Sequence, residues 1–173
     1  TGERSVFAHG IHLAEKEWRC LHETGSAIAF CPTSNLFLGS GLFRLPTSWQ
    51  HQVRIGIGSD VGAGTSFSLL RTLGEAYKVA QLQSYRLRAS EAFYHATLGG
   101  AHALRLDDKI GNFQSGKEAD LVVIDPAVTP LQRLRSARCQ DVYEQLFVLM
   151  TLGDERNISE TWVNGEQVWC NEG

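Results

Sequence analysis

The sequence predicts an α/β protein whose amino-terminal part is organised around a parallel β-sheet. Three short apolar runs, at residues 5–8, 27–31 and 53–58, have the length and residue types of buried strands. The segments between these runs are long enough for the crossover connections that parallel neighbours require. The last third has a different pattern, because Asn164 and Gly165 separate two short alternating runs and predict a β-hairpin.

The predicted strands of the first part alternate with helices and loops. A helix is expected over residues 13–23, with its charged residues on one side. The run 27–31 is apolar throughout, as a strand covered on both faces should be, and Pro32 ends it. Residues 33–46 then predict a long packed loop, and a short helix over 48–52 leads into the third strand.

Helical patterns dominate the middle of the chain. Apolar residues keep helical spacing over residues 66–82, and a second helix is expected over 90–104 with Ser90 as its N-cap. A boundary is therefore expected near residue 106. It would divide the chain into an α/β part, 1–106, and a part with β strands and intervening helices, 107–173.

The part after this boundary combines strand and helix signals. Residues 110–125 predict two strands that flank a turn, and residues 161–169 predict the hairpin. Between them, residues 130–135 and 141–152 predict helices.

Asp60 stands at the carboxyl end of the predicted strand 53–58, within the stretch VRIGIGSDVGAGT. Ligands and catalytic groups collect at this edge of α/β sheets, because the loops there vary over a rigid scaffold. Two other interpretations stay open: Asp60 as a turn former or helix N-cap, and the glycines as a phosphate loop. The third glycine is one place late for a dinucleotide motif, and GAGTS has no Lys, so the phosphate loop matches less well.

Composition argues against several classes of protein. The chain has 16 Lys and Arg against 19 Asp and Glu, a net charge of -3 and no basic run, which argues against a nucleic-acid partner. No apolar stretch is long enough to span a membrane and no signal peptide is evident, so we expect a cytoplasmic protein without a membrane partner. The four cysteines are scattered without a Cys-x-x-Cys pair, which predicts free thiols.

His9, the loop 33–35 and Asp60 follow the carboxyl ends of successive predicted strands, so the sheet should bring them to one edge. A His and an Asp there suit a metal hydrolase, because the carboxylate can bind the cation and accept a proton from the bound water. Two groups are fewer than the protein ligands of most catalytic zinc sites, and no His-x-His pair occurs. Ser34 and Asn35 are expected to brace their loop by hydrogen bonds. The other histidines are expected to be surface or helix-packing residues: His12, His22, His51, His95 and His102.

Several motifs together resemble one family. FAHGIHL, IAFCPTSNLFLGSGLF, IGIGSDVGAGTSFSLL and IGNFQSGKEADLVVID are similar to the carboxyl-terminal part of the guanine deaminases, a branch of the metal-dependent amidohydrolases. AHG, CPTSN and GSD occur across many amidohydrolases, whereas SNLFLGSGLF followed by DVGAGTSFSLL is specific to this branch. The resemblance implies that residues 6–8, 27–31 and 53–58 are the last three strands of a (β/α)8 barrel. It also implies that the strands after Leu106 contribute to a small β-sandwich.

The resemblance further implies a reaction, the hydrolytic deamination of guanine to xanthine and ammonia by a metal-activated water. Asp60 matches the last metal ligand and would also receive the proton of the water. His9 matches a His that orients the water or the guanine. The implied metal is one zinc ion per subunit, and iron is possible because imidazole and carboxylate suit both.

The remaining metal ligands of the family, and its proton-shuttling Glu, would lie before Thr1. This chain does not begin with Met, and we expect it to be one part of the barrel and inactive by itself. The implied partners are the upstream part of the same barrel and a second copy in a homodimer, which residues 147–152 could contact. Two alternatives stay open: a related amidohydrolase that deaminates another aminated heterocycle, and a non-catalytic nucleotide-binding or structural α/β module.

Overall fold

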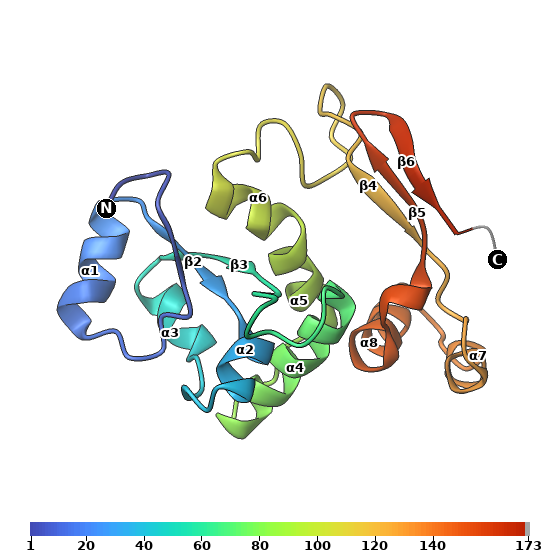
Figure 1. The fold of residues 1–173 in the computed structure, drawn as a ribbon, viewed down its shortest axis with the longest axis horizontal. Helices are drawn as coiled ribbons and strands as arrows, with labels where there is room; N and C mark the ends of the chain where they lie inside the picture. Colours follow the sequence, from blue (N-terminus) through green and yellow to red (C-terminus); the bar gives the residue numbers. More distant parts are fainter. Residues whose placement is uncertain (172–173) are drawn as a thin grey trace.

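The computed structural model describes residues 1–171, and in that part of the chain the named strands form two three-stranded sheets (Figure 1). In chain order the elements are β1 (Val6–Ala8), α1 (Glu15–Glu23), β2 (Ala27–Phe30), α2 (Pro32–Phe37), α3 (Leu45–Gln50), β3 (Arg54–Ile57), α4 (Leu69–Leu82), α5 (Ala89–Ala96), α6 (Leu98–Leu104), β4 (Leu121–Ile124), α7 (Pro130–Ser136), α8 (Val142–Leu152), the short 3₁₀ helix η1 (Glu155–Asn157), β5 (Ile158–Val163) and β6 (Glu166–Cys170).

The first sheet is parallel, with β2 between β1 and β3. Val6 pairs with Ala27, and Ala27 pairs with Arg54, so the strands start level and their carboxyl ends lie along one edge. Helix α6 packs along β3 and also contacts β2. A Cβ atom on Gly56 would lie 3.2 Å from the Cα atom of Gly100. These two glycines therefore allow the helix to lie directly on the strand.

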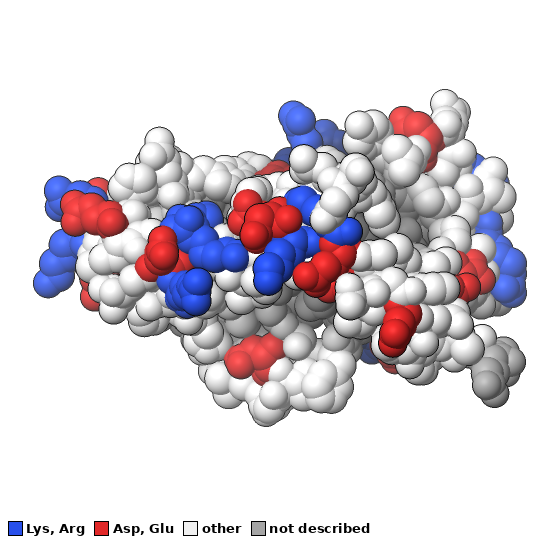
Figure 2. Space-filling model, turned by 90° about the horizontal axis from the view of Figure 1, so that it is seen from above, with Lys and Arg blue, Asp and Glu red and all other residues white. Residues whose placement is uncertain are grey.

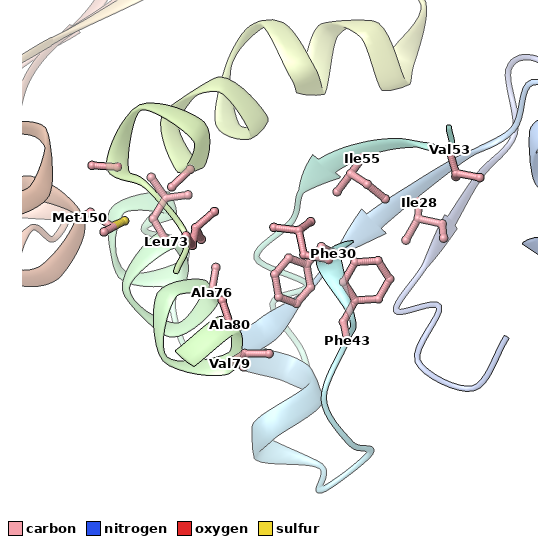
Figure 3. Close-up of a cluster of buried hydrophobic side chains, with 14 of the residues drawn as sticks. Ile28, Phe30, Phe43, Val53, Ile55, Leu73, Ala76, Val79, Ala80 and Met150 are labelled. Carbon is pink, nitrogen blue, oxygen red and sulfur yellow. The ribbon is translucent and has the colours of Figure 1, made fainter. Parts of the chain in front are cut away.

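Buried side chains from the parallel sheet and its helices form one core (Figure 3). The rings of Phe30 on β2 and Phe43 before α3 lie 4.9 Å apart between their centroids. Ile55 on β3 and Leu73 on α4 belong to the same cluster, which extends to Met150 on α8. The core thus fixes the sheet whose carboxyl edge carries the predicted site.

Two connections differ from the sequence prediction. Residues 33–46, predicted as a loop, contain most of α2, because Pro32 occupies the first turn of a helix, where its missing N–H is not needed. The helix predicted over 90–104 is two helices, α5 and α6, which meet at Thr97 with φ -128° and ψ -103°. The break changes the direction of the chain at the point where α6 begins to pack on β3.

Two further predictions were wrong, one about where a helix begins and one about the number of strands in residues 110–125. The helix predicted from Ser66 begins at Leu69, since Ser68 is its N-cap and accepts a hydrogen bond from the Arg71 N–H through its side chain. Among the described residues, only Leu121–Ile124 forms a strand within the predicted pair at 110–125. Residues 110–120, which precede this strand, form turns and bends instead.

The second sheet is antiparallel, in the order β4-β5-β6. Asn164 and Gly165 connect β5 to β6 with φ values of 51° and 80°. Both are positive, as a type I′ turn requires, so the predicted hairpin is confirmed. The predicted helices at 130–135 and 141–152 are confirmed as α7 and α8.

Helix α8 packs against α4 and α5, although it lies after the expected boundary. Val148, Leu149 and Met150 are buried in this contact region of the chain. Most of the apolar run that we expected to face a second copy is thus covered within this chain. The boundary near Leu106 stays a prediction. None of the helices described in residues 1–171 has the length and apolar character needed to cross a membrane.

Candidate active site

His9 lies immediately after β1, at the carboxyl edge of the parallel sheet. Its backbone N–H donates to the carbonyl oxygen of Ala29 at 3.0 Å, which continues the pairing of β1 with β2. The φ angle of His9 is 71° and that of Gly10 is 63°, so the chain turns sharply here. Non-glycine residues adopt this left-handed conformation infrequently, and such residues concentrate at functional sites.

Asp60 follows β3 at the same edge and has a φ angle of 49°. The Gly58 N–H donates to the carbonyl oxygen of Phe30 at 3.0 Å, so the pairing of β2 with β3 continues almost to Asp60. The Gly64 N–H then donates to the carbonyl oxygen of Asp60 at 2.6 Å and closes a tight turn. The N-cap interpretation of Asp60 is wrong, because Ser68 caps the next helix. Asp60 is a turn residue whose side chain remains available.

The sheet brings His9 and Asp60 together. The Nε2 atom of His9 lies 3.7 Å from Oδ2 of Asp60, and the two side chains are 41% and 37% exposed. This distance is too long for a direct hydrogen bond, so a small third group can contact both atoms. Cys31, at the end of β2, completes a cluster whose potential ligand atoms all lie within 4.8 Å of one another.

The Cys31 thiol is buried among these polar groups. Burial, and then the charge of Asp60, raise the pKa of this thiol to about 11, against a smaller opposing effect of a hydrogen bond with the His9 backbone. With no cation bound beside it, the thiol is therefore protonated at neutral pH. The Asp60 carboxylate is a donor that suits a divalent metal such as zinc, and the His9 imidazole lies beside it.

Asn35 contacts His9 from the opposite side. Its Oδ1 atom lies 2.8 Å from Nδ1 of His9, and its side chain is buried. We expected Ser34 and Asn35 to brace their own loop, but the Asn35 side chain instead joins α2 to the residue after β1. Within the described residues, the buried Ser34 Oγ has no hydrogen-bond partner. The bracing hydrogen bonds of Asn35 come from its backbone.

Sequence reasoning placed the loop 33–35 at this edge, but it missed the Cys31 thiol and the side-chain contact of Asn35 with His9. A single Cys at the end of an apolar strand has the pattern of a core residue. The available signal was the position of CPTSN, which follows the middle strand and so lies between His9 and Asp60 along the sheet edge.

The other histidines make contacts elsewhere in the described chain. His12 Nε2 donates to the carbonyl oxygen of Ser40, and His51 stacks on Trp18. His95 is buried, and its Nδ1 lies 3.2 Å from the carbonyl oxygen of Ile55. Desolvation by burial lowers the pKa of His95, which favours a neutral imidazole. His102 lies 3.1 Å from Asp107, and His22 is exposed on α1.

Charged side chains of both signs are interspersed on the face of the molecule seen in Figure 2. A nucleic acid would need a stripe of basic residues, and this face does not offer one.

Comparison with known proteins gives the chain its family. It matches the model of the amidohydrolase family over residues 1–168. It is 62% identical over 169 residues to the guanine deaminase of Escherichia coli strain K12, a match that covers 98% of this chain and 38% of that protein. This chain therefore spans well under half of the length of that curated relative.

Solved structures agree with this match. A structure of the E. coli guanine deaminase aligns with a TM-score of 0.97 and 60% identity, over 99% of this chain and 40% of the other. An adenosine deaminase from Xanthomonas campestris with bound zinc aligns with a TM-score of 0.82 and 28% identity, over 96% of this chain and 37% of the other. The predicted α/β class and amidohydrolase fold are thus confirmed. Since the family model covers nearly the whole sequence, the chain belongs to the amidohydrolase family.

Proposed function

We propose that the intact protein containing this chain converts guanine and water into xanthine and ammonia. The observation that carries the proposal is the 3.7 Å approach of His9 Nε2 to Asp60 Oδ2 at the carboxyl edge of the sheet. Two proton acceptors at one point suit the activation of a water molecule. The 62% identity to the E. coli guanine deaminase supports guanine as the substrate.

Asp60 is the proposed metal ligand of this chain. Its exposed carboxylate is a donor that suits a divalent cation, and the His9 imidazole lies beside it, where it can orient a water. When bound, the metal would lower the pKa of water toward about 7 and so supply a nucleophile at neutral pH. The donor types suit zinc, which the X. campestris adenosine deaminase contains, and iron is the alternative.

Asp60 and His9 have separate proposed roles in catalysis and substrate binding. The Asp60 carboxylate accepts the proton that the attacking water loses. His9 Nε2 accepts a hydrogen bond and directs the water oxygen toward the guanine carbon that carries the amino group. A C–O bond forms at this carbon and its C–N bond breaks, which releases ammonia. In the family resemblance, a Glu of the upstream part of the barrel protonates the leaving group.

The proposal is tested with the intact enzyme in a guanine-to-xanthine absorbance assay, before and after removal of metal with a chelator. We expect activity in the metal-replete enzyme, loss on chelation and recovery when zinc or iron is added back. The isolated 173-residue chain should neither deaminate guanine nor retain metal after dialysis. Absence of guanine conversion by the metal-replete intact enzyme would overturn the proposal.

A related amidohydrolase acting on another aminated heterocycle is the second candidate. The alignment with the X. campestris adenosine deaminase favours it, because that structure matches 96% of this chain with a TM-score of 0.82. Comparison of kcat/KM for guanine, adenine and adenosine separates the two. A higher kcat/KM for adenine or adenosine than for guanine would show that guanine is not the preferred substrate.

The nucleotide-binding alternative gains no support from the loop after β3. Asp60 presents a negative charge there, and a phosphate group would be repelled. We further propose a cytoplasmic homodimer that includes the upstream part of the barrel, on the basis of the family resemblance. Light scattering of the intact enzyme measures its mass, and a monomer would contradict the dimer.

A further inference from the structure

Asn35 and His9 are 26 positions apart, yet their side chains meet within hydrogen-bond distance in the candidate site. Asn35 Oδ1 lies 2.8 Å from His9 Nδ1. An amide oxygen only accepts hydrogen bonds, so His9 Nδ1 carries the proton in this arrangement. The neutral imidazole then has its lone pair on Nε2, the atom that faces Asp60. Asn35 thereby makes Nε2 an acceptor.

The consequence for the site is that two acceptors face one point. His9 Nε2 and Asp60 Oδ2 are 3.7 Å apart and both have lone pairs available. A molecule with two O–H donors, such as water, satisfies both at once. With the opposite tautomer, Nε2 would carry a proton and would donate to the Asp60 carboxylate or to the water oxygen instead. The tautomer of His9 therefore decides how a water is oriented.

Asn35 is held more firmly than His9. Its backbone N–H donates to the carbonyl oxygen of Cys31 at 3.0 Å, and its carbonyl oxygen accepts from the Ser40 N–H at 2.9 Å. The Asn35 residue is 1% exposed and lies on α2, which packs against α4. His9, by contrast, lies in a turn with left-handed φ, and its side chain is 41% exposed. The fixed residue orients the exposed one.

We propose that Asn35 is a positioning residue that fixes the tautomer and ring orientation of His9, and this inference rests on the function proposed above. Asn35 would not touch the substrate or the reacting atoms. It would act through His9 alone, so its effect should disappear when His9 is replaced.

The test is a double-mutant cycle in the intact enzyme, with Asn35→Ala, His9→Gln and the double variant. Metal content, kcat and KM are measured for each, per amount of folded protein. We expect Asn35→Ala to lower kcat by about 10–100-fold, as loss of a group that orients a catalytic imidazole does, with metal content retained and KM changed by less than about threefold. In the His9→Gln background, Asn35→Ala should change kcat by less than about twofold.

Asn35→Asp is the conservative variant, because it keeps an oxygen in the place of Oδ1. It should retain kcat within about threefold of the unsubstituted enzyme. Where Asn35→Ala does not fold, Asn35→Leu takes its place, since it fills the volume without offering an acceptor. Equal impairment of the Asp and Ala variants would overturn the proposal.

Asn157→Ala is the matched control. Asn157 is also a fully buried Asn, and its amide donates to the carbonyl oxygen of Asp125 at 2.7 Å, between β4 and β5. This variant should lose stability but keep kcat within about twofold, because a buried polar group is removed far from His9. The same kcat loss in this control would indicate a general effect of destabilisation and overturn the inference.

Two kinds of failure are distinguishable. Additive effects of Asn35→Ala and His9→Gln in an enzyme that deaminates guanine would refute the positioning role alone. An unsubstituted metal-replete enzyme that does not deaminate guanine would refute the proposed function, and the inference with it.

Discussion

The two sheets of this chain differ in how their side chains are covered. On the parallel sheet, Ile28, Phe30 and Ile55 are nearly inaccessible to solvent. On the antiparallel sheet, Val122 is 50% exposed and Val168 is 58% exposed. The core of the first sheet is thus completed by helices of the same chain, whereas the second sheet presents apolar side chains to solvent.

The candidate site lies on the better packed sheet. His9 and Asp60 follow β1 and β3, and the packed strand β2 lies between these two strands. A catalytic arrangement needs support of this kind, because loosely held groups lose the geometry that the reaction requires. Even here one strand is incompletely covered: Val6 and Phe7 of β1 are 38% and 43% exposed, and β1 is an edge of the sheet. The first sheet is thus least covered at β1.

The largest expected effect concerns the chain in isolation. The exposed apolar residues and unpaired strand edges should make the isolated chain aggregate or behave as a molten species unless the upstream part of the barrel is supplied. Light scattering, binding of a hydrophobic dye and the sharpness of unfolding measure this. A monomer with low dye binding and a cooperative transition would contradict the proposed difference between the sheets, because both sheets would then be adequately covered.

A pair of substitutions in the intact protein compares directly how well the side chains of the two sheets are buried. Phe30→Ala should lower the free energy of unfolding by about 3–5 kcal/mol, because it leaves a cavity in the core of the first sheet. Val122→Ala, on the half-exposed face of β4, should cost less, about 1 kcal/mol, if this face is only partly covered in the intact protein. Urea unfolding gives both values. Similar losses at the two positions would mean that the intact protein buries β4 as fully as β2.

A smaller effect concerns Asp154, which precedes β5 and links the antiparallel sheet to helix α4 of the first region. The Asp154 carboxylate accepts hydrogen bonds from the Arg156 guanidinium at 2.9 and 2.6 Å and lies 3.6 Å from Arg71 on α4. The hydrogen bond with Arg156, with added attraction from Arg71, lowers the pKa of Asp154. Its folded pKa thus lies below its unfolded value, so the ionised form contributes stability above the unfolded pKa. That contribution is lost as the pH falls through the folded pKa.

The measurement is the free energy of unfolding of the unsubstituted protein and of Asp154→Asn from pH 7 down to acid pH. Asp154→Asn should cost about 1 kcal/mol at pH 7, where the carboxylate is ionised, and the difference should shrink as the carboxylate becomes protonated. Lys78→Gln removes an exposed ion pair with Glu75 and serves as the control, with little change at any pH. A pH-independent difference for Asp154→Asn would show that charge does not contribute to the link.

The contrast between the sheets also explains which elements were predictable from the sequence. Strands β2 and β3 were predicted to within about a residue, β2 because it is apolar throughout and β3 because apolar residues alternate along it. The hairpin was predicted because Asn164 and Gly165 adopt the positive φ that their turn requires. In each case the signal is local. The convergence of His9 and Asp60 at one edge also followed from the parallel order of the strands.

The elements that were missed depend on tertiary contacts. Helix α2 is short and starts at Pro32, which the sequence presented only as the end of a strand. The break at Thr97 allows α6 to approach β3, where Gly100 of the helix lies close to Gly56 of the strand. A glycine within a helical pattern does not reveal which strand the helix approaches. The side-chain contact between Asn35 and His9 likewise joins helix α2 to the turn after β1, two segments that are 26 positions apart. The spacing of residues within either segment does not predict this contact.

The central claim is that His9 and Asp60 form the active centre with different roles, and metal content together with kcat in the intact enzyme tests it most directly. Asp60→Ala should lose both metal and turnover, because it removes the proposed ligand and the proton acceptor. His9→Gln should retain most of the metal while kcat falls by about 10²–10⁴-fold, the contribution of a positioned proton-handling group. If His9→Gln strips the metal as completely as Asp60→Ala does, His9 is a ligand and its assigned role is wrong. If both variants keep kcat within about threefold, well below that range, the cluster is structural and the central claim fails.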